Sequence, residues 1–159
     1  MLEAKSVFEK CCVSQAWVQH MAVARPFSSE KELFNRSEFI WFQLEEKDWK
    51  EAFAGHPKIG DIESLRKKYA QSKTWSTQEQ SGMDEANEKV IQELADLNEK
   101  YEKKFGYIFI VCATGKSAFE MLEILKKRIH HSPDDELKIA ASEQNKITQI
   151  RLQKLLNEI

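Results

Sequence analysis

Glycine, proline and cysteine are all scarce in this sequence of 159 residues, with five, three and three copies. Because glycine and proline form most tight turns, their scarcity argues against an all-β fold, which needs a turn after every short strand. Long apolar stretches are also missing. The longest apolar run covers only 107–113, whereas a membrane-spanning helix needs roughly 18 apolar residues. We therefore expect a soluble, mainly helical protein.

Neither sign of charge dominates. The formal net charge is -2, and lysines alternate with glutamates instead of clustering on one stretch, which argues against a protein that binds nucleic acid by neutralising phosphates. The first residues lack the apolar core of a signal peptide, and the last three are not a targeting tripeptide, so we expect a cytoplasmic protein. The length and the 42% hydrophobic content predict one domain covering 1–159.

The cysteines do not form a recognisable framework. Cys11 and Cys12 are adjacent, and Cys112 lies inside the apolar run. An odd number without regular spacing indicates reduced thiols that behave as small core residues. Adjacent cysteines cannot easily reach one tetrahedral metal ion together, so the sequence predicts no zinc site.

Helical patterns cover most of the chain. The capping pattern Ser-x-x-Glu begins at Ser29, Ser76 and Ser117. From Ser76, apolar residues recur at steps of three and four until Gly106, which predicts one long helix. We expect further helices at about 3–23, 30–45, 47–54, 61–72 and 134–159, the last capped by Asp134.

The apolar segment 105–112 is the exception, and it is either a buried extended segment or the start of an apolar helix. No linker or internal repeat interrupts the helical patterns. The fold prediction is an all-α bundle of about seven to nine helices.

His56 is a candidate general acid or base. It precedes Pro57, and proline disfavours helical dihedral angles in the residue before it, so His56 lies on a stiffened loop. Histidine titrates near neutral pH, which suits proton transfer. The alternative is a loop histidine that only caps a neighbouring helix.

Two other sets of polar residues have both structural and functional interpretations. Glu79 and Gln80 follow Ser76 in a capping box, but free N–H groups at a helix start also stabilise a substrate oxygen. Arg151 lies within the apolar arc of the last helix, where its charge needs a partner. That partner is either a structural carboxylate or a bound anion. We expect Lys58 and Arg128 to be solvated.

These candidates belong to longer stretches that follow one another in a definite order. The stretches are 8–12 with Trp17, 25–27, 48–53, 56–61 (His-Pro-Lys-Ile-Gly-Asp), 75–82, 105–117 and 136–152. Together they resemble the 2-oxo-4-hydroxy-4-carboxy-5-ureidoimidazoline (OHCU) decarboxylases of uric acid degradation. The resemblance extends along almost the whole chain.

The resemblance implies an all-α fold, a homodimer, no cofactor, and conversion of OHCU to (S)-allantoin and CO2. By motif, His56 and Glu79 match the family's catalytic residues. The matching substrate-binding residues are Pro57, Ser76, Gln80, Ile110, Ala113 and Arg151. The sequence departs from the family pattern at Val13, where a glycine is expected, and at 114–116, where other members have an arginine after Cys-Ala.

A mechanism follows as a hypothesis. Arg151 holds an anionic or carbonyl oxygen of the substrate, and Glu79 binds its hydroxyl and ureido groups, with Gln80 and Ser76 completing the polar shell. His56 manages the proton. Two alternatives stay open: a helical binding module without turnover, and an enzyme of related fold that acts on another ureido or imidazoline acid.

Overall fold

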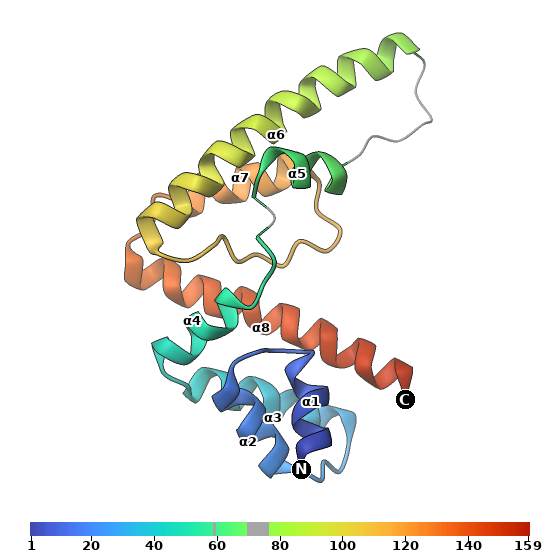
Figure 1. Cartoon of the computed structure of the whole chain (residues 1–159), viewed down its shortest axis with the longest axis vertical. Helices are drawn as coiled ribbons and strands as arrows, with labels where there is room; N and C mark the ends of the chain where they lie inside the picture. Colours follow the sequence, from blue (N-terminus) through green and yellow to red (C-terminus); the bar gives the residue numbers. More distant parts are fainter. Residues whose placement is uncertain (59, 70–76) are drawn as a thin grey trace. The chain divides into compact units, whose positions relative to one another are not determined.

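The computed structural model describes residues 1–58, 60–69 and 77–159, except for the side chains of 77–86. These ranges contain eight helices and no strand (Figure 1), which confirms the all-α prediction. The helices are α1 (Leu2–Glu9), α2 (Gln15–Ala24), α3 (Glu30–Gln43), α4 (Glu46–Ala54), α5 (Ile62–Lys68), α6 (Thr77–Phe105), α7 (Ala118–Arg128) and α8 (Pro133–Glu158). No described helix carries an apolar stretch long enough to span a membrane.

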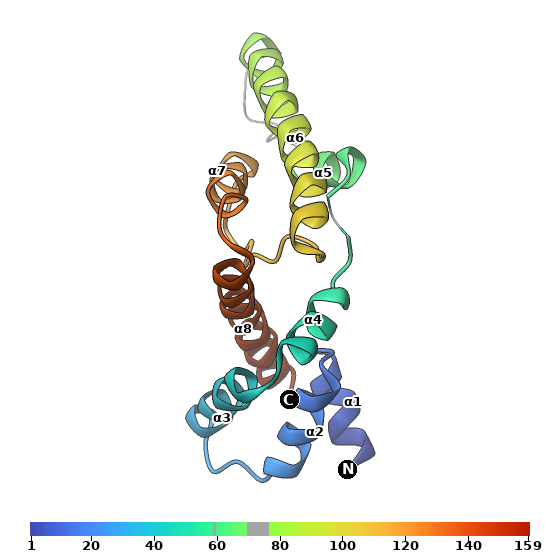
Figure 2. The same ribbon diagram turned by 90° about the vertical axis from the view of Figure 1, so that its left-hand side faces the viewer.

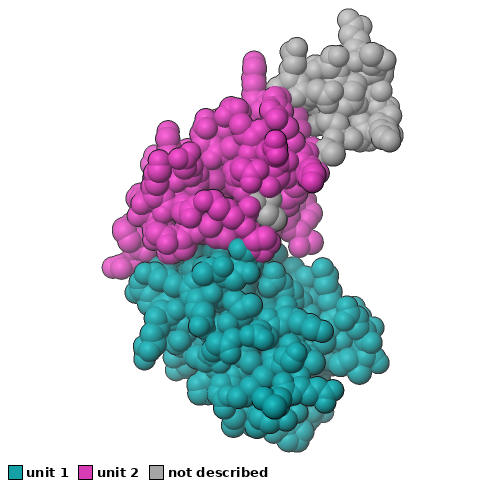
Figure 3. Space-filling view, viewed as in Figure 1, with its two compact units in different colours: residues 1–56, 110–112, 137–159 teal, residues 57–109, 113–136 magenta. Residues whose placement is uncertain are grey.

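The chain divides into two compact units, coloured separately in Figure 3. Unit 1 consists of Met1–His56, Ile110–Cys112 and Leu137–Ile159, and unit 2 of Pro57–Phe109 and Ala113–Glu136. Most of α8 therefore belongs to unit 1, and its first turn to unit 2. The expectation of one domain covering 1–159 stays a prediction.

Unit 1 is built around α2, which contacts α1, α3 and α4. Trp17, Trp41 and Phe53 are fully buried in its core. Trp41 and Gln149 bond the unit-1 part of α8 to α3. The Trp41 indole donates to the Ala141 carbonyl at 2.8 Å, and the Gln149 amide donates to the Phe34 carbonyl at 3.3 Å and to the Ser37 hydroxyl at 3.5 Å. Burial of large aromatic rings supplies most of the stability of such a core.

The prediction of a single helix over 3–23 is wrong, because α1 ends at Glu9 and α2 begins at Gln15. Ser14 is the reason: its hydroxyl accepts a hydrogen bond from the Trp17 N–H at 3.4 Å and starts a new helix, as serine side chains commonly do. Cys11 and Cys12 lie in the connection, and they and Cys112 are buried and free. The prediction of reduced core thiols is thereby confirmed.

In unit 2, the long helix α6 packs against both α5 and α7 (Figure 2). It ends at Phe105, and Gly106 follows with a φ of 84°, a conformation that glycine adopts without strain. This end was predicted. The residues that follow form no helix until α7, and Tyr107, Ile110 and Cys112 among them are buried. Of the two alternatives for this segment, the buried extended one is correct.

Helix starts agree with the sequence in part. Ser29 and Ser117 cap α3 and α7 as expected, while Ser76 lies outside the described residues. Asp134 does not cap α8. The Ser132 hydroxyl accepts from the Asp135 N–H instead, and Pro133 is the first helical residue, a position that suits proline because no N–H is needed there. The helix expected over 61–72 ends at Lys68, and 70–72 lie outside the described residues.

Arg128 is buried, so its prediction as a solvated residue is wrong, whereas Lys58 is indeed exposed. Arg128 continues the buried face of α7 formed by Met121, Leu122 and Leu125. Its guanidinium pairs with the carboxylate of Glu136, which is 0% exposed, at 2.5 Å. Pairing is necessary because an isolated buried charge is very costly.

The Glu136 carboxylate has two further partners in unit 2. The Tyr101 hydroxyl donates to it at 2.5 Å, and His131 Nδ1 lies 3.1 Å from its second oxygen. The Arg128 guanidinium also lies 4.6 Å from the Phe109 ring centre. Burial and the bond to Glu136 raise the pKa of Tyr101, so this phenol stays a donor. The cluster is a hydrogen-bonded network around a buried carboxylate, with His131 at its exposed edge.

Candidate active site

The predicted site residues fall into three groups. His56, Arg151 and Ile110 belong to unit 1. Pro57 and Ala113 belong to unit 2. The remaining three are at the start of α6: Glu79 and Gln80 lie within its first turns, with side chains outside the described residues, and Ser76 lies outside them altogether. The structure thus brings His56 and Arg151 into one unit.

His56 directly follows the end of α4. Its backbone N–H donates to the Phe53 carbonyl at 3.3 Å, and its ring is half-buried. Nε2 of the ring lies 2.5 Å from Oε1 of Gln144 in the interior of α8. This partner is a side chain rather than a helix end, so the interpretation of His56 as a mere cap finds no support in the described contacts.

The environment of His56 favours the neutral form of its ring. Burial lowers the pKa of His56 below its ordinary value of 6.5, and the positive charge of Arg151 lowers it further, while the bond to Gln144 acts in the opposite direction. A neutral imidazole at neutral pH can accept a proton.

Arg151 has few internal partners for its charge. Its Nη1 donates to the Cys11 carbonyl at 3.4 Å. Among the residues that the structure describes, no carboxylate forms an ion pair with it. A guanidinium carries five N–H donors, and one of them is bonded within the described part of the chain. Of the two partners considered for Arg151, a structural carboxylate is not found among the described residues, and the choice between the two stays a prediction.

Two polar residues of α8 were missed in the sequence. Gln144 is 1% exposed and binds His56. Glu143 accepts a hydrogen bond from the Cys112 N–H at 3.2 Å and so fastens the 110–112 segment to α8. A signal for Gln144 was present: Gln144, Thr148 and Arg151 have the spacing i, i+4, i+7 of one helix face. Polar residues repeated on a core-facing stripe indicate a bonded network.

Val13 and Gly55, the residue that precedes His56, form a close contact. A Cβ atom on Gly55 would lie 2.0 Å from Cγ2 of Val13. The valine methyl therefore occupies the space that the glycine leaves open, which explains how the chain accommodates valine where the family resemblance leads one to expect glycine.

We expect Gly55→Ala to destabilise the protein by about 1–3 kcal/mol through overpacking. The double variant Val13→Gly/Gly55→Ala should recover most of that loss, because the methyl groups no longer collide. Urea unfolding of the two single variants and the double variant measures the coupling. If the changes in the free energy of unfolding caused by the two substitutions were additive, the contact between Val13 and Gly55 would be refuted.

The pKa of His56 provides a second prediction. In an NMR titration, its midpoint should lie below 6.5, and Arg151→Met should raise it, because a repelling positive charge is removed. Arg36→Met on the exposed face of α3 is the matched control and should leave the midpoint unchanged. Since His56 titrates lower when folded, its contribution to stability is present above the unfolded pKa and is lost as the pH falls through the folded value. An unchanged midpoint in Arg151→Met would refute the coupling.

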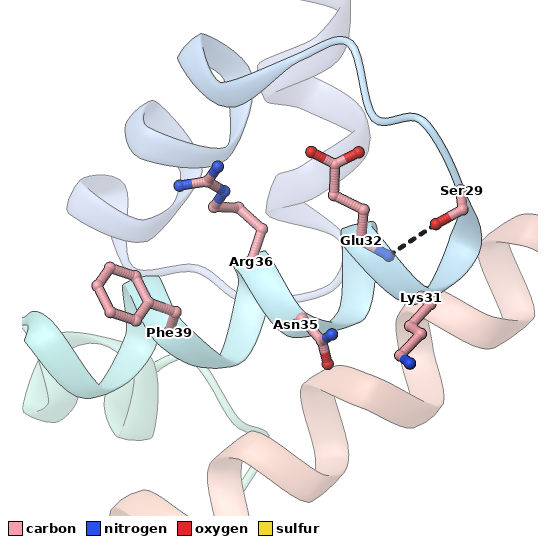
Figure 4. A pocket seen from close by; sticks show the side chains of 6 residues that line it. All are labelled: Ser29, Lys31, Glu32, Asn35, Arg36 and Phe39. Atoms are coloured by element: carbon pink, nitrogen blue, oxygen red, sulfur yellow. Dashed lines mark hydrogen bonds between the residues drawn. The ribbon is translucent and has the colours of Figure 1, made fainter.

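A surface depression on unit 1 does not compete with this site. It runs along α3 and is lined by Ser29, Lys31, Glu32, Asn35, Arg36 and Phe39 (Figure 4). All six residues belong to α3 or its cap, whereas binding pockets are enclosed by several elements. None of the predicted site residues lines it.

Comparison with known proteins agrees with the resemblance. A sequence model described as OHCU decarboxylase matches residues 2–153. The chain belongs to the OHCU decarboxylase family. The uric acid degradation bifunctional protein of Arabidopsis thaliana is 38% identical over 149 residues, which cover 93% of this chain and 46% of that protein. The OHCU decarboxylase of Xenopus laevis is 28% identical over 96% of this chain and 86% of its own length.

A solved structure shares the fold. The crystal structure of an OHCU decarboxylase in the presence of (S)-allantoin superposes with a TM-score of 0.75, at 38% identity, over 94% of this chain and 96% of that one. The chain spans less than half of the bifunctional relatives it matches: 46% of the Arabidopsis protein and 28% and 29% of two Bacillus proteins.

Proposed function

We propose that this chain converts OHCU to (S)-allantoin and CO2, the last step from urate to allantoin, without a cofactor. The observation that carries the proposal is the pair His56 and Arg151 in unit 1. A histidine held neutral lies in the field of an arginine that has no carboxylate partner among the described residues. This pair suits a substrate that is anionic and must exchange a proton. The 38% identity to an OHCU decarboxylase crystallised with (S)-allantoin supports it.

The chemistry of the substrate explains the need for both residues. When the bond to the carboxylate breaks, CO2 leaves and its electron pair passes into the conjugated carbon–nitrogen system of the ring. The ring nitrogen that receives the electron pair takes up the proton that the hydroxyl loses as it becomes a carbonyl, and one proton from the solvent is added at the carbon that bears the ureido group. Arg151 orients the anion, and His56 transfers the proton on one face. Transfer to one face yields a single enantiomer.

The other predicted residues have proposed roles that rest on their motifs. Glu79 binds the hydroxyl and ureido N–H groups, and Ser76 and Gln80 complete the polar shell. Pro57 stiffens the loop of His56. Ile110 and Ala113 contact the substrate. We further propose that the protein is a cytoplasmic homodimer, in accordance with the family resemblance. Light scattering coupled to gel filtration tests the homodimer, because it measures the mass of the particle in solution.

The test of the activity is a coupled assay. Urate oxidase and hydroxyisourate hydrolase generate OHCU in situ, and circular dichroism follows the optical activity of the allantoin formed. OHCU also decays spontaneously to racemic allantoin, so the expected result is rapid formation of the (S) enantiomer only when the chain is present. Slow racemic product, identical with and without the chain, would refute the proposal and favour a binding module. Activity only on another ureido acid would redirect it to a related substrate.

A further inference from the structure

Gln144 connects His56 to the interior of unit 1 through a chain of hydrogen bonds. Oε1 of Gln144 lies 2.5 Å from His56 Nε2, and its Nε2 donates to the Thr148 hydroxyl at 3.1 Å. The Cys12 thiol is near Thr148, whose hydroxyl lowers the pKa of that thiol. The three residues behind His56 are almost fully inaccessible, with Gln144, Thr148 and Cys12 exposed by 1%, 3% and 1%. The mechanism proposed above assigns no function to these hydrogen bonds.

We infer that Gln144 is a positioning residue that holds His56 in the tautomer with its proton on Nε2 and leaves Nδ1 as the nitrogen that exchanges a proton with the substrate. An amide oxygen can only accept, so the ring nitrogen facing it must carry the hydrogen. The bond made by one ring nitrogen decides which nitrogen of a neutral imidazole is protonated. The exchange with substrate rests on the proposed function, whereas the tautomer is a property of the folded chain alone.

The orientation of the amide follows from the groups behind it. Its NH2 group faces the Thr148 hydroxyl, which accepts this bond at 3.1 Å. Burial raises the pKa of Cys12 to about 11, so this end of the chain is uncharged at neutral pH. Arg151 is the charged group that acts on His56 among the described residues, and it disfavours the imidazolium. The ring is therefore neutral, and its tautomer is set by the amide.

Nδ1 has no hydrogen-bond partner within the described part of the chain. A neutral ring with Nε2–H therefore presents a lone pair on Nδ1 that is not engaged by these residues. This is the arrangement that proton transfer needs.

Nitrogen-15 NMR of the uniformly labelled full chain reads the tautomer directly, without substrate. At a pH above the His56 midpoint, Nε2 should show the shift of a protonated ring nitrogen and Nδ1 that of an unprotonated one. The reverse pattern would overturn the inference. Gln144→Met, which removes the acceptor at similar volume, should give a mixture of the two tautomers, and unchanged pure Nε2–H in this variant would also overturn it.

Kinetics separate a positioning role from a packing role. Gln144→Glu keeps an acceptor for Nε2–H but adds a negative charge, which favours the imidazolium. The acid limb of the kcat/KM profile should therefore move to higher pH, with the Nε2–H tautomer retained above it. Gln144→Met should lower kcat by about tenfold, the scale of one lost hydrogen bond. Its acid limb should move to lower pH, because the bond that this variant loses raises the pKa of His56. Loss of packing alone would affect both variants without moving the pH profile of Gln144→Glu.

Gln149→Met is the matched control, because Gln149 is another glutamine of α8, half-buried where Gln144 is buried, and it bonds to the Phe34 carbonyl of α3. It should change neither the tautomer nor the profile, and a change as large as in Gln144→Met would overturn the inference. Folded variants are verified by circular dichroism. If the protein has the Nε2–H tautomer but does not turn over OHCU, the role of Gln144 is supported and the proposed function is refuted. Failure of the inference and failure of the proposed function are therefore distinguishable.

Discussion

Replacing His56 by asparagine is expected to lower the rate of OHCU decarboxylation by about 100- to 10,000-fold at neutral pH, the usual contribution of a positioned acid or base. Asparagine is smaller than the imidazole but polar, and His56 is half-buried just after the end of α4, so the fold should persist. It cannot exchange a proton near neutral pH. The coupled assay with circular dichroism measures both the rate and the enantiomeric composition of the product.

Stereochemistry makes this test sharper than a rate alone. Because OHCU decays spontaneously to racemic allantoin, a variant without proton transfer at one face should yield product that approaches the racemate. His20→Asn is the matched control: His20 is an exposed histidine of α2 in the same unit, and its replacement should change neither quantity. Full rate with full enantioselectivity in His56→Asn would remove His56 from the mechanism.

Glu136→Gln is expected to cause the largest loss of stability, about 3–5 kcal/mol, because it leaves the charge of Arg128 buried without its counterion. That loss is a large fraction of the roughly 5–15 kcal/mol that typically stabilises a folded protein. The melting temperature should fall by about 10 °C for a chain of this size. Thermal and urea unfolding followed by circular dichroism measure the change.

Two further variants identify the cause. Arg128→Met/Glu136→Leu removes both charges, and it should be more stable than Glu136→Gln, because no unpaired charge stays buried. Glu88→Gln removes the partner of Arg66 in an ion pair at the surface of unit 2 and should have little effect, since water and salt screen exposed pairs. Equal destabilisation by Glu136→Gln and Glu88→Gln would show that the buried network does not stabilise the fold.

The sequence predicted helices well where periodicity and caps agreed. The end of α6 at Gly106 and the starts of α3 and α7 at Ser29 and Ser117 were all predicted, because capping is a local interaction within three or four residues. The break between α1 and α2 was missed. Apolar spacing continues across it, and a serine in the middle of a helical pattern does not by itself reveal whether it caps a new helix.

Arg128 and Gln144 show a different limit. Both lie at helical spacings on buried faces. Whether a single polar side chain is buried, and what it bonds to, depends on the residues that pack against it. Arg128 is buried because Glu136, eight residues later, turns its carboxylate back onto it. Gln144 can act on the site only because it bonds to His56, a histidine 88 residues earlier in the chain. Such pairings are set by packing and have no signature in local sequence.

The sequence by itself determined the all-α class, most helix boundaries, the family and the candidate residues, because these depend on local hydrogen bonding, on periodicity and on motifs in order. Only the tertiary structure decided that burial lowers the pKa of His56, that its ring bonds to Gln144, and that Arg151 has no carboxylate partner among the described residues. The physical reason is that burial and electrostatic fields arise from groups that are distant in the chain and become neighbours only when the helices pack.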